Sequence, residues 1–137
     1  MTRMLSVLVV AGASLLLAAT ASPKTGTTLT IRHQLHGCHA WSVNGGAYKP
    51  SQSVTLEKGA TLTVVDNDVM PHRLVKVSGP ALTLPSSANM SHSGATTHVK
   101  FSKAGVYTFT TKAGEDYMKG VKTIGEDNVL KLKVTVS

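Results

Sequence analysis

Three histidines and the chain's single cysteine lie close together in the sequence. They are His33, His36, Cys38 and His39. Imidazole and thiolate groups together suit copper or zinc far better than calcium or magnesium. The cluster follows a segment that alternates like a strand, so it predicts a metal site at a strand end. His33 falls in the apolar phase of that segment, and we expect it to be a core residue or a support for the ligands.

The lone cysteine also has explanations that involve no metal. A single thiol in an exported protein cannot close an internal disulfide. Cys38 would then be a small buried apolar residue, or a thiol bonded to another molecule. These alternatives stay open on the sequence alone.

A second polar group lies at residues 66–72, directly after an apolar segment. Asp66, Asn67 and Asp68 favour a tight turn. Pro71 then precedes His72, and proline restricts the backbone of the approach. An imidazole held in this way is a candidate metal ligand. A third group, at residues 114–120, contains Glu115 and Met118.

The segments that must position these groups alternate with a period of two. The clearest pattern places four apolar residues on one face and polar residues on the other: Leu130, Leu132, Val134 and Val136. Such alternation is typical of strands with one buried and one wet face. Gly, Asn, Asp and Pro clusters separate the strands, and residues 81–96 resemble a long surface loop. We therefore expect an all-β protein, a single Greek-key β-sandwich of about seven strands.

The first 21 residues resemble a signal peptide. Arg3 precedes an apolar run over residues 4–17, and Ala19-Thr20-Ala21 fits a cleavage site. The run is shorter than the roughly 20 residues that span a bilayer. We expect one domain over residues 22–137, secreted or periplasmic, with no membrane anchor after cleavage.

The charge and composition exclude some classes of function. The formal net charge is +7, but the cations are spread along the chain and aromatic residues are 4% of it. Nucleic acid is therefore not an expected partner. No nucleophile–base pairing can be argued from the sequence, so we do not expect an enzyme.

Two motifs resemble those of the cupredoxin family. The first is the Asp/Asn-rich turn followed by Pro71-His72, and the second is Lys-Ala-Gly-Val-Tyr-Thr-Phe at residues 103–109. Gly114-Glu115 and Met118-Lys119-Gly120 fall where azurin-like members carry related residues. The resemblance covers residues 27–136 and implies a cupredoxin-like sandwich with a copper site.

The resemblance also implies roles for individual residues. His72 matches the first histidine ligand of the family, and Met118 matches its weak axial methionine. Thr111 (or Thr110) stands where the family places its cysteine, and Glu115 stands where it places its second histidine.

In cupredoxins the loop after the first strand lies at the same end of the sandwich as these ligands. The resemblance thus implies that this loop brings a relocated thiolate to the site. We expect one copper ion with Cys38 and His72 as strong ligands. One of His36 or His39 would be a third ligand, and Met118 or Glu115 a fourth.

The sequence therefore predicts an exported copper protein used for copper holding, delivery or one-electron transfer. Its partners would be the copper ion and a redox or copper-transfer protein. The alternative is a metal-free cupredoxin-like interaction or structural domain, in which Cys38 is free or bonded to another molecule.

Overall fold

The computed structural model describes residues 26–34, 38–113 and 129–137. The proposed signal segment, His36, Glu115 and Met118 lie outside these residues. The elements are β1 (Thr27–Gln34), β2 (Cys38–Val43), β3 (Ser51–Leu56), β4 (Thr61–Asp66), β5 (His72–Ser78), a 3₁₀ helix η1 (Ser86–Ala88), β6 (Asn89–Met90), β7 (Ala95–Lys100), β8 (Gly105–Ala113) and β9 (Lys131–Val136). None of the helical structure in these ranges is long and apolar enough to cross a membrane.

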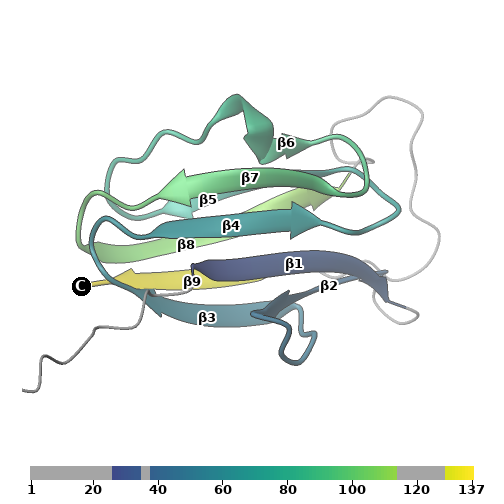
Figure 1. The fold of residues 1–137 in the computed structure, drawn as a ribbon, viewed down its shortest axis with the longest axis horizontal. Coiled ribbons are helices and arrows are strands. Elements are labelled where there is room, and N and C mark those ends of the chain that lie inside the picture. The colour runs from purple at the N-terminus through teal and green to yellow at the C-terminus, as the bar shows by residue number, and fades with distance from the viewer. Residues whose placement is uncertain (1–25, 35–37, 114–128) are drawn as a thin grey trace, which may run out of the picture.

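The strands form two sheets that overlie one another (Figure 1). One sheet has the order β2-β1-β4-β7, and the other has the order β3-β9-β8-β5-β6. The pairs β1–β4 and β3–β9 are parallel, and the remaining pairs are antiparallel. The predicted all-β sandwich is confirmed.

The core lies between the sheets and is made by the apolar phase of the alternating strands. In β9 the side chains of Leu132, Val134 and Val136 are buried, while Lys131 and Lys133 are exposed. The same alternation buries Leu62 and Val64 in β4, and Tyr107 and Phe109 in β8. Burial of such a side chain contributes about 1.5–3 kcal/mol, so the alternation seen in the sequence accounts for the two-layer structure.

The described residues contain nine strands, not about seven. One of the additional strands, β6, has two residues and lies within the predicted loop, where Met90 pairs with His72. The other, β2, does not alternate between buried and exposed residues, because four consecutive residues, 39–42, are buried. A strand covered on both faces has no polar phase, so periodicity does not reveal it.

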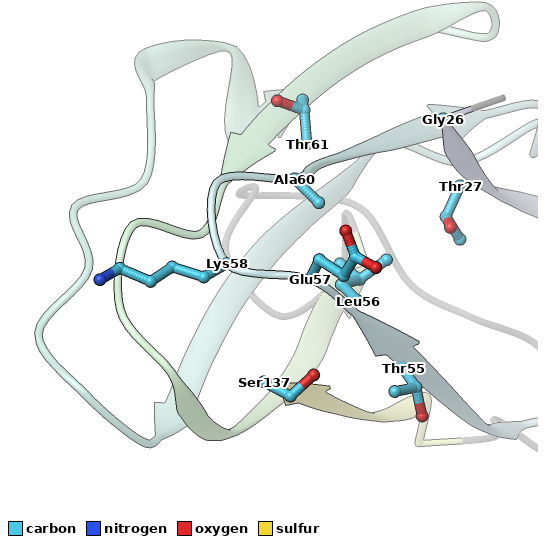
Figure 2. Close-up of a pocket in the computed structure, with 9 residues that line it drawn as sticks. All are labelled: Gly26, Thr27, Thr55, Leu56, Glu57, Lys58, Ala60, Thr61 and Ser137. Carbon is cyan, nitrogen blue, oxygen red and sulfur yellow. The ribbon is translucent and has the colours of Figure 1, made fainter. Parts of the chain in front are cut away.

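The two ends of the sandwich differ in chemistry. A hollow of about 540 Å³ lies at the end where β1 and β4 begin. Figure 2 shows the residues that line it. Its titratable side chains are Glu57 and Lys58, and in the view Lys58 extends away from the other labelled side chains. His33 and His39, the two histidines of the sequence cluster within the described residues, lie at the opposite end, where β1 and β4 finish.

Candidate metal centre

Four strand ends bring the described parts of the first two predicted ligand segments together at one end of the sandwich. β1 and β4 run in parallel, with Ile31 paired to Asp66, so both finish at this end. β2 begins there because Cys38 pairs with Gln34 across the antiparallel β1–β2 ladder. This end lies on the right side of Figure 1. In the second sheet, β5 begins beside the described end of β8, where His72 pairs with Ala113.

Two buried imidazoles from different sheets meet at this end. His39 of β2 and His72 of β5 are 1% and 0% exposed. Their ring centroids are 4.6 Å apart, with the rings perpendicular. The structure therefore brings together two of the predicted ligands, His39 and His72, whose positions are 33 residues apart in the sequence.

The carboxylate of Asp68 joins these two rings. Its Oδ2 atom accepts hydrogen bonds from His39 Nδ1 at 2.6 Å and from His72 Nε2 at 3.1 Å. The backbone N–H of Met70 donates to the other oxygen, Oδ1, at 3.0 Å. Asp68 is fully buried, so its charge is compensated by these donors and not by water.

Asp66 fixes the turn that carries Asp68. Its Oδ1 atom accepts the N–H of Asp68 at 2.9 Å, and its Oδ2 atom accepts the N–H of His72 at 3.1 Å. A carboxylate that bonds the backbone two residues ahead forms the turn expected for Asp. The predicted turn is therefore also part of the site, because its hydrogen bonds position both Asp68 and His72.

The remaining nitrogen of His72 faces Thr111. The distance from Nδ1 to the hydroxyl oxygen of Thr111 is 3.2 Å. In the tautomer whose Nε2–H donates to Asp68, Nδ1 is the acceptor for the Thr111 hydroxyl. Thr110 instead donates its hydroxyl to the carbonyl of Leu130 at 2.7 Å. Of the two threonines that the resemblance left open, Thr111 is the one that faces the histidine.

The two carboxylates have opposite pKa shifts. Burial raises the pKa of Asp66 to about 6, although its hydrogen bonds to backbone N–H groups and the nearby His72 oppose the rise. Burial alone would also raise the pKa of Asp68. However, hydrogen bonds from His39, His72 and the backbone of Met70 outweigh burial and hold the pKa of Asp68 well below its usual range.

His33 extends this cluster toward solvent. It lies directly opposite His39 in the β1–β2 ladder, so both side chains are on the same side of the sheet. His33 Nδ1 is 3.8 Å from Asp68 Oδ1, and its side chain is 47% exposed. The expectation of a core position is wrong because the sandwich ends at this point, although the side chain does follow the apolar phase of β1.

Cys38 begins β2 next to His39. The residue is half-buried and has a positive φ of 58°. One nitrogen each from His33 and His39 and one oxygen of Asp68 lie within 4.8 Å of one another. Cys38 is not in this group among the described residues. Its proposed role and those of His36, Glu115 and Met118 stay predictions.

Asp68 is the residue of this site that the sequence analysis did not single out as a possible ligand. The sequence predicts a turn at Asp68, because Asp-Asn-Asp sequences favour turns. Its spacing of four residues from His72, across the restrictive Pro71, was the available signal. The spacing alone does not show burial, which depends on how the two sheets pack.

The donor set fits a metal held by nitrogen and oxygen atoms. Imidazole is a common ligand of copper and zinc, and a carboxylate is accepted by both in their divalent forms. Blue copper sites need two histidines and a cysteine. At His72 Nδ1 the described residues place the Thr111 hydroxyl, and the described donors fit a nitrogen–oxygen site.

No family model matches the chain, and no curated protein matches its sequence. Similar solved structures include amicyanin from Paracoccus versutus, at 16% identity and a TM-score of 0.43, covering 85% of each chain. They also include a purple cupredoxin from Nitrosopumilus maritimus, at 17% identity and a TM-score of 0.44, covering 80% of this chain and 98% of that one.

The 2F4 variant of the McoA multicopper oxidase from Aquifex aeolicus has a TM-score of 0.52 at 13% identity. The alignment covers 85% of this chain and 27% of the oxidase. At such low identity the likeness concerns the fold alone. With two facing sheets that contain both parallel and antiparallel pairs, the chain has a cupredoxin-like fold.

Proposed function

We propose that this protein binds copper at the end of the sandwich where His39 and His72 converge, and that it works outside the cytoplasm. It holds or delivers the ion, or transfers single electrons, and it is not an enzyme. The observation that carries the proposal is the 4.6 Å approach of two buried imidazoles from different sheets, with Asp68 bonded to both.

The residues present have distinct tasks in this proposal. Imidazole nitrogens and the carboxylate of Asp68 supply the donors, and Asp68 also fixes the orientation of the rings and compensates positive charge. Bound copper would supply the ability to gain or lose one electron. The strand ends limit the movement of the donors, because His39 belongs to the β1–β2 ladder and His72 to the β5–β8 ladder.

The surface charge supports a protein partner with an acidic surface. The described residues contain ten lysines and arginines but three acids. Two of those acids, Asp66 and Asp68, are buried at the site, and the exposed one is Glu57. A strongly basic surface accelerates encounter with acidic surfaces, and this steering weakens as salt is added.

Copper titration of the untagged chain tests the function. We expect one ion per chain by native mass spectrometry, and a loss of at least about tenfold in affinity in the variant His39→Gln, since a removed donor is not replaced. The matched control is His98→Gln, because His98 is exposed on β7 and bonds Thr63 away from the site. Absence of uptake with both Cu(I) and Cu(II) would reject the proposal.

A second candidate function is a metal-free interaction domain. The favouring observation is that Asp68 already accepts hydrogen bonds from both imidazoles and from Met70. A network of this kind stabilises a fold without any ion. Under this alternative the variant His39→Gln loses stability, while the wild-type chain takes up no copper.

A further inference from the structure

We propose that His33, His39 and Asp68 form a sulfur-free site for a divalent ion of the Cu(II) or Zn(II) type. The inference deepens the proposed function and rests on it where the ion is copper. It replaces the thiolate-containing ligand set that the sequence suggests with one made of two imidazoles and a carboxylate.

The first argument is the convergence of the donor atoms. One potential ligand atom from each of the three residues lies within 4.8 Å of the other two. His39 Nδ1 is 2.6 Å from one oxygen of Asp68, and His33 Nδ1 is 3.8 Å from the other oxygen. Donors that share one zinc ion lie roughly 3–4 Å apart, given bonds of about 2.0–2.2 Å. In the metal-bound form the proton of His39 would lie on Nε2, which leaves Nδ1 able to bind the ion. Small side-chain adjustments would then let one ion contact all three residues.

The second argument is that neighbouring groups already hold Asp68 in place. Its Oδ2 atom is bonded by His72 Nε2, and its Oδ1 atom by the N–H of Met70. The His72 ring is itself held by Thr111, at 3.2 Å. Groups that orient a ligand in this way raise metal affinity, since less freedom is lost on binding. In this arrangement His72 supports the ligands through Asp68.

The third argument concerns access for the ion. His39 and Asp68 are buried, whereas the side chain of His33 is 47% exposed. His33 and His39 are direct partners across the β1–β2 ladder, and their ring centroids are 6.5 Å apart. An ion can thus reach the buried donors along the exposed ring without a large change in the sheets.

The donor chemistry sets the preference among ions. Nitrogen and carboxylate oxygen donors suit Cu(II) and Zn(II), while sulfur donors favour Cu(I). The positive backbone angle of Cys38, at a φ of 58°, breaks the extended path that leads to His39. Cys38 is not among the three residues whose donor atoms converge, so the proposed ligand set does not include its sulfur.

The test uses isothermal titration of the full chain with Zn²⁺ and Cu²⁺, and electron paramagnetic resonance of the Cu²⁺ form. We expect one Zn²⁺ per chain and a copper spectrum of nitrogen and oxygen ligation. The variant His33→Gln should lose about tenfold or more in affinity for both ions, as expected for a lost ligand. His98→Gln, which also removes an exposed histidine on a strand, should remain within about twofold of the wild type.

The variant Cys38→Ser separates this inference from the proposed function. Unchanged Zn²⁺ and Cu²⁺ affinities in Cys38→Ser support the sulfur-free site. A tenfold loss in that variant, or full affinity in His33→Gln, overturns the inference even if the protein still binds copper. If the wild type takes up no copper but binds Zn²⁺ through His33, the proposed function fails and the site stands. Because His33 is half exposed, circular dichroism should show that His33→Gln folds normally.

Discussion

The substitution Asp68→Asn removes the charge that links His39 to His72 while nearly preserving the shape of the side chain. The amide oxygen can still accept the N–H of Met70, now 3.0 Å from Oδ1. The amide nitrogen would then face His39 Nδ1 and His72 Nε2, which both donate to Oδ2 in the native protein. Two buried donors thus meet a third donor in place of an acceptor.

The magnitude follows from these two contacts. A hydrogen bond to a charged group contributes about 1.5–3 kcal/mol, and a buried unsatisfied donor costs about 1–3 kcal/mol. Loss of two such bonds, partly offset because no buried charge remains, should lower the free energy of unfolding by about 2–4 kcal/mol. A change of tautomer at either histidine would place the loss at the lower end of this range.

Urea denaturation at neutral pH, followed by circular dichroism, measures this difference. The slope of the free energy of unfolding against urea concentration should be unchanged, so that the shift in the midpoint of the transition reports the change in stability. Nitrogen chemical shifts of the histidine rings give a second readout, because the protonated nitrogen of each ring should change in the variant.

Glu57→Gln is the matched control, because it makes the same chemical change at an exposed residue near the other end of the sandwich. We expect its free energy of unfolding to stay within about 0.5 kcal/mol of the wild type. If Asp68→Asn is no less stable than Glu57→Gln, and its histidine tautomers are unchanged, the role assigned to this carboxylate is wrong.

Further predictions concern the copper ligands, the pH dependence and a glycine turn. Thr111→Cys in a Cys38→Ser background should produce an intense thiolate-to-copper absorption band with Cu(II), because position 111 faces His72 Nδ1. Thr110→Cys in the same background should produce no such band, because the side chain at position 110 faces Leu130. Since the pKa of Asp66 is raised to about 6 from 3.8, the folded state binds more protons than the unfolded state between these values. Raising the pH from 4 to 7 should therefore lower the free energy of unfolding by about 2–3 kcal/mol more in the wild type than in Asp66→Asn, and equal pH profiles from urea melts would contradict this. The pKa of Asp68 is lowered, so its contribution is present above pH 4 and should be lost as the pH falls below that value. Gly79→Ala should lower the free energy of unfolding by about 3 kcal/mol or more, because at a φ of 112° a Cβ would lie 2.6 Å from the Val106 oxygen. Gly45→Ala should lower it by about 1 kcal/mol in the same urea melts, because Gly45 has a φ of 73° but open space around the position of a Cβ.

The sequence predicted the β-sandwich because alternation is a local property of each strand. Leu132, Val134 and Val136 face the core because each neighbour along the strand points to the opposite side. Two strands were harder to predict for the same reason. β2 is buried on both faces and β6 has two residues, so neither has a readable period.

Part of the site was also available from the sequence. The histidine cluster and the Pro71-His72 pair pointed to His39 and His72, and the structure places these rings together. The choice of Thr111 over Thr110 required the β5–β8 register, in which Thr111 pairs with Leu74 and its side chain reaches His72. Which threonine faces a ring is a property of two strands, and neither strand fixes it alone.

The sequence by itself determined the regularly alternating strands, the turn at Asp66 and the types of donor available near it, because these depend on neighbouring residues. The tertiary structure decided that Asp68 is a buried carboxylate between two imidazoles and that His33 is the exposed member of the cluster. It did so because burial and convergence depend on where one sheet ends relative to the other. The relative position of the two sheets depends on packing across the whole core, so it cannot be predicted from the pattern of residues within one strand.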